Sequence, residues 1–202
     1  MKKYILLLFL LTYQNLAFSE YSAEQGQVKS MVCIACHGPN GNSAIPTFPK
    51  LAGQHATYFT KQMNDFLSGA RVDPVMKMQL DILKLSKQDI GNIALFYAQQ
   101  KSSVGTTDPK LAQRGKQIYL GGDNQKSITA CSACHGPKGA GISSANYPQI
   151  SGQHAGYTVK QLQSFRAGSR ANDANMMMRT VVSKMTDDDI MAVASYIQGL
   201  KQ

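Results

Sequence analysis

Two nearly identical stretches of nine residues, CIACHGPNG at 33–41 and CSACHGPKG at 131–139, lie 98 positions apart in this chain of 202 residues. The similarity extends beyond them, because residues 51–71 align without gaps on 150–170 with ten of 21 positions identical. A repeat with a period of about 98 to 100 residues is too long for a solenoid and suits two small domains of similar fold.

All four cysteines of the chain belong to these two stretches, as the pairs Cys33/Cys36 and Cys131/Cys134. Such pairs occur in disulfides, in zinc sites and in dithiol redox centres. A histidine follows each pair directly, and Cys-x-x-Cys-His is the attachment sequence for c-type haem. On a helical turn, two thiols at this spacing can add to the two vinyl groups of one haem. The repeat therefore predicts two covalently attached haem c groups, one in each half.

The rest of each half is predicted to be helical. A first helix is expected at about 23–36 in the first half. In the second half it starts at Asp108-Pro109, where a capping residue precedes a residue favoured in the first turn. A middle helix with one apolar face is expected to begin near Gln54 or Gln153, followed by a loop that holds methionines.

The last helices are expected to begin at Ser86 and Thr186, each of which precedes an aspartate by three residues. The small polar residues at 101–108 are typical of a linker. No strand is predicted. We therefore expect an all-α chain with domains at 20–103 and 104–202.

Residues 1–19 have the composition of a secretory signal peptide: two early lysines, an apolar run at 4–11 and the small residues Ala17 and Ser19 before the expected cleavage site. Cleavage is expected after Ser19. The alternative is an uncleaved membrane anchor, for which the apolar run is short against the roughly 20 residues that a spanning helix needs. An exported chain would work in the periplasm.

Removal of this leader would leave 19 basic and 12 acidic side chains, a net charge of +7. A basic protein can bind nucleic acid, anionic lipid or an acidic protein. The sequence has no basic run and no arginine-rich helix, so no nucleic acid partner is expected. An acidic redox protein, docked in a small and transient contact, is the expected kind of partner.

Each haem iron has two axial positions, and His37 and His135 are expected to take one in each half. The second ligand sets the chemistry, because methionine raises the reduction potential, whereas an open position allows oxygen or peroxide chemistry. Counted back from the capping residue of the last helix, Met78 and Met178 both lie eight positions earlier. Because Met76 and Met176 both lie ten earlier, the repeat leaves two methionine pairs open.

Four further stretches carry a resemblance to a known family: FPKLAGQ at 48–54, YPQISGQHAGYTVKQL at 147–162, NDANMMMR at 172–179 and SYIQGL at 195–200. With the two Cys-x-x-Cys-His motifs, they make the chain similar to dihaem cytochromes c of the c4 type over its exported length. The resemblance implies that each half is a small all-helical class I cytochrome c domain. It also implies that Met78 and Met178 are the ligand methionines, and that Met76, Met176 and Met177 pack in the core or at the haem edge.

Two other matched pairs are candidates for supporting roles. Pro49 and Pro148 follow the motif histidines by 12 and 13 residues. The resemblance implies that their carbonyls accept the Nδ1 proton of the ligand histidine, and the alternative is a proline that only shapes the loop. Arg71 and Arg170 are expected either to pair with haem propionates or to be solvated at a helix end.

His55 and His154 lie in identical Gly-Gln-His-Ala contexts at the start of the middle helices. As axial ligands they would make bis-histidine haems. The alternative is an exposed or capping histidine, which the resemblance favours.

Two haems in one chain give two one-electron stations held close together. We therefore expect an electron carrier, soluble or loosely membrane-associated, that passes electrons from a respiratory donor to a terminal oxidase or similar acceptor and transforms no substrate. One alternative is a fixed haem subunit of a larger dehydrogenase or oxidase. Another is a dihaem peroxidase, against which the similarity of the halves and the paired methionines count. The donor, the acceptor and the oligomeric state are left open.

Overall fold

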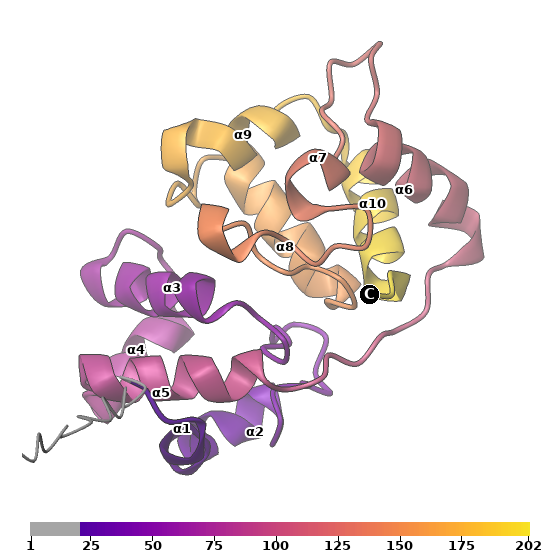
Figure 1. Cartoon of the computed structure of the whole chain (residues 1–202). Helices are drawn as coiled ribbons and strands as arrows, with labels where there is room; N and C mark the ends of the chain where they lie inside the picture. The colour runs from indigo at the N-terminus through magenta and orange to yellow at the C-terminus, as the bar shows by residue number, and fades with distance from the viewer. Residues whose placement is uncertain (1–20) are drawn as a thin grey trace, which may run out of the picture.

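The computed structural model describes residues 21–202, so the expected leader at 1–19 lies outside the described residues. Figure 1 shows two helical lobes joined by an extended segment, which confirms the expected all-α fold of two tandem domains. Within this range β-structure is limited to two isolated bridges. None of the helices in the same range has the length and apolar character needed to cross a membrane.

The two domains contain similar helices in the same order. The helices of the first domain are α1 (Ala23–Ser30), a 3-10 turn (Met31–Cys33), α2 (Ile34–His37), α3 (Ala56–Ser68), α4 (Pro74–Leu83) and α5 (Lys87–Ala98). Those of the second domain are α6 (Pro109–Gly121), α7 (Ser132–His135), a 3-10 turn (Ser143–Ala145), α8 (Ala155–Arg166), a 3-10 turn (Ala174–Met176), α9 (Met177–Val182) and α10 (Asp187–Gly199).

The predicted helix starts agree with the structure. Asp108 caps α6 by accepting a hydrogen bond from the amide of Lys110. Ser86 and Thr186 each form a capping box with the aspartate three residues later, which satisfies amide groups that the helix itself leaves free. The segments that hold the methionines are helical, which corrects the expectation of loops.

The first and last helices of each domain cross at a glycine. Gly26 of α1 lies so close to α5 that an added Cβ would be 2.0 Å from the carbonyl oxygen of Asn92. Gly115 of α6 approaches α10 in the same way, and its Cβ would be 2.2 Å from the carbonyl oxygen of Ala192. A residue with a side chain would push the two helices apart. These crossings close each domain around its core.

A fully buried tyrosine belongs to the core beside each crossing, but the two domains place it on different helices. In the first domain it is Tyr97 on α5, and the residue four after the crossing glycine is the small Ser30. In the second domain it is Tyr119 on α6, four residues after the glycine, and α10 has Ile197 at the place of Tyr97. Each domain therefore has one fully buried tyrosine ring beside the crossing, which comes from the last helix in the first domain and from the first helix in the second domain.

The segment between the domains, residues 101–108, is tied to the first domain. The side-chain oxygen of Asn42 accepts a hydrogen bond from the amide of Ser103 at 2.7 Å. The buried Nζ of Lys50 donates to the carbonyl oxygens of Ser103 and Gly152, both at 2.9 Å. Lys50 thus joins the first domain to the linker and to the second domain.

The glycine crossing yields a stability prediction. Gly115→Ala should destabilise the haem-loaded protein by about 3 kcal/mol, because its methyl group would overlap the α10 backbone. Guanidinium unfolding followed by far-ultraviolet circular dichroism measures this. Gly121→Ala, in the same helix and with no atom within 4 Å of its Cβ, is the control. It should stabilise slightly, by about 0.5 kcal/mol. Similar effects of the two substitutions would contradict the close approach.

Candidate functional site

The cysteine pairs lie on the short helices α2 and α7 and the residue before each, and none of the four forms a disulfide. Burial raises the pKa of the Cys33 thiol, and burial raises the pKa of Cys131 to about 11. A reactive dithiol centre needs a lowered thiol pKa, so these environments do not suit one. In the described part of the chain, no group of three or more His, Cys, Asp or Glu side chains could hold a metal ion. The raised thiol pKa values therefore count against the dithiol alternative.

The histidines of the two motifs are buried and held by proline carbonyls. The Nδ1 atom of His37 donates to the carbonyl oxygen of Pro49 at 2.9 Å, and that of His135 donates to Pro148 at 2.9 Å. Burial lowers the pKa of both imidazoles, although each carbonyl acts in the opposite direction. Each ring is thus a neutral imidazole with its proton on Nδ1. The Nε2 lone pair is the one available to a metal ion.

A largely apolar cavity lies in the second domain. Its wall includes Cys131, Cys134, His135 and Met178. Apolar side chains of α8, α9 and α10 complete the lining, among them Leu162, Phe165, Val182, Val193 and Ile197. Two thiols, an imidazole and a thioether around an apolar space are the donor set and surroundings of a covalently bound haem. The residues of this domain therefore fit the predicted cofactor.

A second cavity adjoins His37 in the first domain. Its wall includes Phe48, Phe66 and Met76. Cys33 packs against the core cluster that contains Phe66, so the motif and the cavity lie close together. Met78 does not line this cavity, and its side chain is 52% exposed. The structure thus brings His135 and Met178 together but does not bring His37 and Met78 together.

The course of α4 explains the exposure of Met78. Asp73 caps this helix and Pro74 occupies its first turn, so α4 runs unbroken past Met78. Met76 and Leu80 are four residues apart and lie on the side that packs in the core. Met78 falls between them in sequence and lies on the other side.

The corresponding helix of the second domain has a different start. Asn175 and Met176 adopt left-handed backbone conformations, with φ of 51° and 57°. The helix α9 begins only at Met177. Met178 and Val182, four residues apart, therefore share the side that packs in the core.

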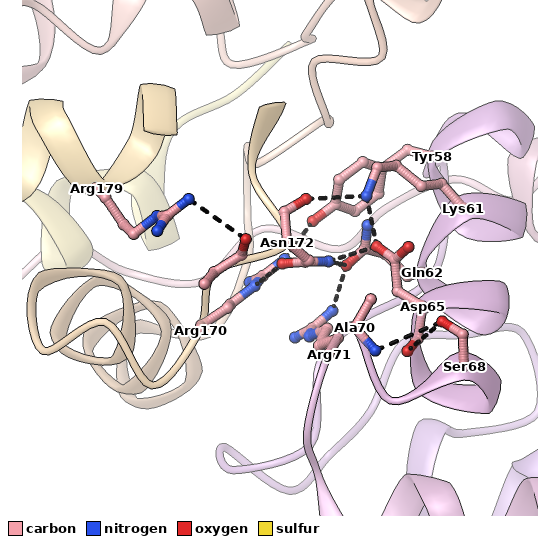
Figure 2. Close-up of polar contacts among 11 residues, drawn as sticks. Tyr58, Lys61, Gln62, Asp65, Ser68, Ala70, Arg71, Arg170, Asn172 and Arg179 are labelled. Atoms are coloured by element: carbon pink, nitrogen blue, oxygen red, sulfur yellow. Dashed lines mark hydrogen bonds and ion pairs between the residues drawn. The ribbon is translucent and has the colours of Figure 1, made fainter. Parts of the chain in front are cut away.

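Arg71 is buried in the contact between the domains, with 8% of its surface exposed. Its guanidinium donates to the hydroxyl of Tyr157 at 2.9 Å and to the side-chain oxygen of Gln161 at 2.9 Å, both in the second domain. It also donates to Gln62 of its own domain at 2.8 Å. Figure 2 shows this arginine beside Gln62, with Arg170 approaching from the other domain. The solvated alternative therefore does not describe Arg71.

Arg170 makes the equivalent contacts in the opposite direction and is also 8% exposed. It donates to Tyr58 at 3.0 Å and to Gln62 at 3.0 Å in the first domain, and to Gln161 of its own domain at 2.8 Å. The same residue types thus contact each other from both sides, as in a dimer with a two-fold axis.

His55 and His154 take part in the same contact. The Nε2 of His55 lies 2.8 Å from the carbonyl oxygen of Ala140, and that of His154 lies 2.8 Å from that of Ser43. Both carbonyls belong to the loop that follows the motif of the other domain. The Nε2 atom of each ring is thus occupied by a backbone contact across the domains, which does not favour bis-histidine haems.

Sequence reasoning missed most residues of this contact. They include Lys50, Gln54, Tyr58, Gln62, Gln149, Gln153, Tyr157 and Gln161. The signal was present in the ungapped pairing of 51–71 with 150–170. Several of its identical positions are residues that face the opposite domain, because a two-fold contact requires the same residue types on both sides.

Known proteins resemble this chain in sequence and in fold. The sequence matches the cytochrome c family model over residues 23–101 and 112–201. Cytochrome c4 of Azotobacter vinelandii is 44% identical over 207 residues, which cover 98% of this chain and 99% of that protein. The crystal structure of reduced recombinant cytochrome c4 from Pseudomonas stutzeri has a TM-score of 0.85 and 46% identity, and the match covers 89% of this chain and 99% of that chain. A thiosulfate dehydrogenase electron acceptor of Stutzerimonas stutzeri (strain A1501) is 35% identical over 176 residues, covering 86% of this chain and 81% of that protein.

Two helical domains with one Cys-x-x-Cys-His motif each define a protein that binds two haem c groups covalently, through Cys33 and Cys36 and through Cys131 and Cys134. The chain belongs to the cytochrome c family and, within it, to the dihaem cytochromes of the c4 type. It transfers electrons and is not an enzyme.

The buried arginines yield a second prediction. Arg71→Ala should destabilise the haem-loaded protein by about 3 kcal/mol, because it removes three buried hydrogen bonds of a guanidinium group and leaves the Tyr157 hydroxyl without this donor. Guanidinium unfolding measures the loss. Lys77→Ala removes an exposed ion pair with Asp81 on α4 and should cost less than about 0.5 kcal/mol. Equal losses would show that the guanidinium does not link the domains.

Proposed function

We propose that this chain is an exported electron carrier in which each haem iron is held by one histidine and one methionine. Each haem, when bound, supplies a one-electron couple between ferric and ferrous iron. We infer the axial pairs His37 with Met78 and His135 with Met178. The pair His37 with Met78 rests on the position of Met78 eight residues before the cap of the last helix and on the family resemblance, because the structure does not bring these two residues together. The observation that carries the proposal is the cavity of the second domain, where His135 and Met178 line the same space as the attachment cysteines.

The surroundings of the histidines support this role. Because the carbonyls of Pro49 and Pro148 hold the Nδ1 protons, each ring keeps one tautomer and one orientation. Such a bond also strengthens the imidazole as a ligand. A thioether as the second ligand raises the reduction potential, as an electron carrier requires.

We infer that Arg71 and Arg170 lie near the haem propionates. Arg71 lines the cavity of the first domain and Arg170 that of the second. The hydrogen bonds of both guanidinium groups go to neutral oxygens of tyrosine, glutamine or asparagine. Propionates would supply the negative charge that these buried cations lack.

The cavities support electron transfer from one domain to the other. Tyr58 and Gln62 of the first domain complete the wall of the cavity in the second domain. Tyr157 and Lys160 of the second domain complete the wall of the cavity in the first domain. Electrons would therefore enter at one domain, cross this contact and leave from the other.

For partners, we infer a respiratory donor and a terminal oxidase or similar acceptor, each docked transiently on this basic chain. The similarity to a thiosulfate dehydrogenase electron acceptor favours a second candidate, a haem protein that serves one dedicated dehydrogenase. Co-purification of a stoichiometric dehydrogenase at physiological salt would favour the second candidate over the first.

We infer that residues 1–19 are removed on export, that the domains span 20–103 and 104–202, and that the protein works in the periplasm. It would be free there or loosely attached to the membrane surface. Amino-terminal sequencing of the exported protein tests the cleavage after Ser19.

The axial methionines are tested by spectroscopy. A pyridine haemochrome assay should count two c-type haems per chain, and the ferric protein should show the near-infrared charge-transfer band of methionine-ligated haem. Met78→Ala and Met178→Ala should each remove about half of this band, because each iron loses its thioether.

Met76→Ala is the matched control, since Met76 lies two residues from Met78 on α4 and should leave the band intact. A half-loss in Met76→Ala with no loss in Met78→Ala would transfer the ligand role to Met76. A high-spin or bis-histidine spectrum of the unmodified protein would overturn the proposal.

A further inference from the structure

The contact between the domains has a symmetric centre and an asymmetric edge. At the edge, Asn172 of the second domain reaches α3 of the first. Its Nδ2 donates to the side-chain oxygen of Gln62 at 3.0 Å and to a carboxylate oxygen of Asp65 at 2.6 Å. The Nζ of Lys61 donates to the backbone oxygen of Asn172 at 3.0 Å. Figure 2 shows Asn172 between Arg170 and these α3 side chains.

Asn172 lies in the loop between α8 and the 3-10 turn that precedes Met178. The next residue, Asp173, accepts hydrogen bonds from the backbone amide of Arg179 at 3.0 Å and from its Nε at 2.8 Å. The side chain of Asp173 is only 4% exposed, so this ion pair is well shielded from water. Because Arg179 directly follows Met178, the pair closes the loop at both ends. Asn172 therefore directly precedes a segment, 173–179, that the ion pair closes around Met178.

The equivalent loop of the first domain lacks this support. Asp73 stands two residues after the interface arginine, as Asn172 does in the second domain. Its carboxylate caps α4. The same carboxylate lies 3.5 Å from the Nζ of Lys160 across the domain contact, and the side chain of Lys160 is 63% exposed. Ser164 takes the place of Asp65, and its hydroxyl donates to the carbonyl oxygen of Lys160 within α8.

We propose that α3 of the first domain is a positioning element for the methionine loop of the second domain, acting through Asn172. This proposal rests on the proposed role of Met178 as an axial ligand. While Asn172 is held, the loop keeps the thioether beside the second iron. When it is released, the loop opens more often and external ligands compete for the iron. The support is asymmetric, because Asn172 has hydrogen bonds to three residues of α3, whereas its counterpart Asp73 meets α8 in the 3.5 Å contact with the exposed Lys160.

The test is an imidazole titration of the ferric, haem-loaded, full-length protein. In Asn172→Ala, the second haem should bind imidazole about tenfold more tightly, because hydrogen bonds that favour the closed loop are lost. The first haem should change less than about twofold. The band lost in Met178→Ala identifies the second haem. Amide hydrogen exchange over residues 172–179 should increase in the same variant.

Two lysines, at equivalent positions of α3 and α8, give matched controls. Lys61→Ala removes the hydrogen bond to the backbone oxygen of Asn172. It should also raise the imidazole affinity of the second haem, by a smaller factor than Asn172→Ala does. Lys160→Ala removes the contact with Asp73, and it should leave the imidazole affinity of the second haem and the hydrogen exchange of residues 172–179 unchanged.

An equal rise in imidazole affinity at both haems in Asn172→Ala would overturn the proposal, because it would indicate general loosening. No change at either haem would overturn it as well. If the methionine band of the second haem survives in Met178→Ala, the ligand assignment fails instead, and the hydrogen exchange of 172–179 still decides whether α3 holds the loop.

Discussion

The placement of the two domains depends on the guanidinium groups of Arg71 and Arg170, each of which is buried against the opposite domain. A buried cation without partners is strongly unfavourable. Arg71 finds Tyr157 and Gln161 across the contact, and Arg170 finds Tyr58 and Gln62. Neither domain can satisfy its own arginine alone. The distance between the haem cavities, on which electron transfer depends, is therefore a property of the whole chain.

Features that depend on sequence neighbours were predicted well. The motif helices, the capping boxes at Ser86 and Thr186 and the start of α6 after Asp108 all follow from residues within one turn of each other. The domain contact is not local in this sense. The flanking residues of His55 show a helix start, but they do not show that the ring faces the backbone of Ala140 in the other domain.

The methionines mark the limit of reasoning from a repeat. Counting residues between matched positions assumes that both halves keep the same helix from end to end. In the second half, left-handed conformations at Asn175 and Met176 delay the start of α9, whereas α4 begins at Pro74 and runs on. Positions that correspond in number, such as Met78 and Met178, therefore face different surroundings. Side-chain propensity gives a weak signal for the left-handed conformation at Asn175, because asparagine adopts it more readily than most residues, but it gives none at Met176.

The exchanged tyrosines at the helix crossings have a genetic consequence. Tyr97 pairs with a small residue on α1, and Tyr119 pairs with an isoleucine on α10. A recombinant domain with α1 and α10 would have Ser30 opposite Ile197 and a void between them. One with α6 and α5 would have two rings competing for one space. Crossing-over between the two halves of the gene would thus produce defective domains, and selection against it would let the two copies diverge.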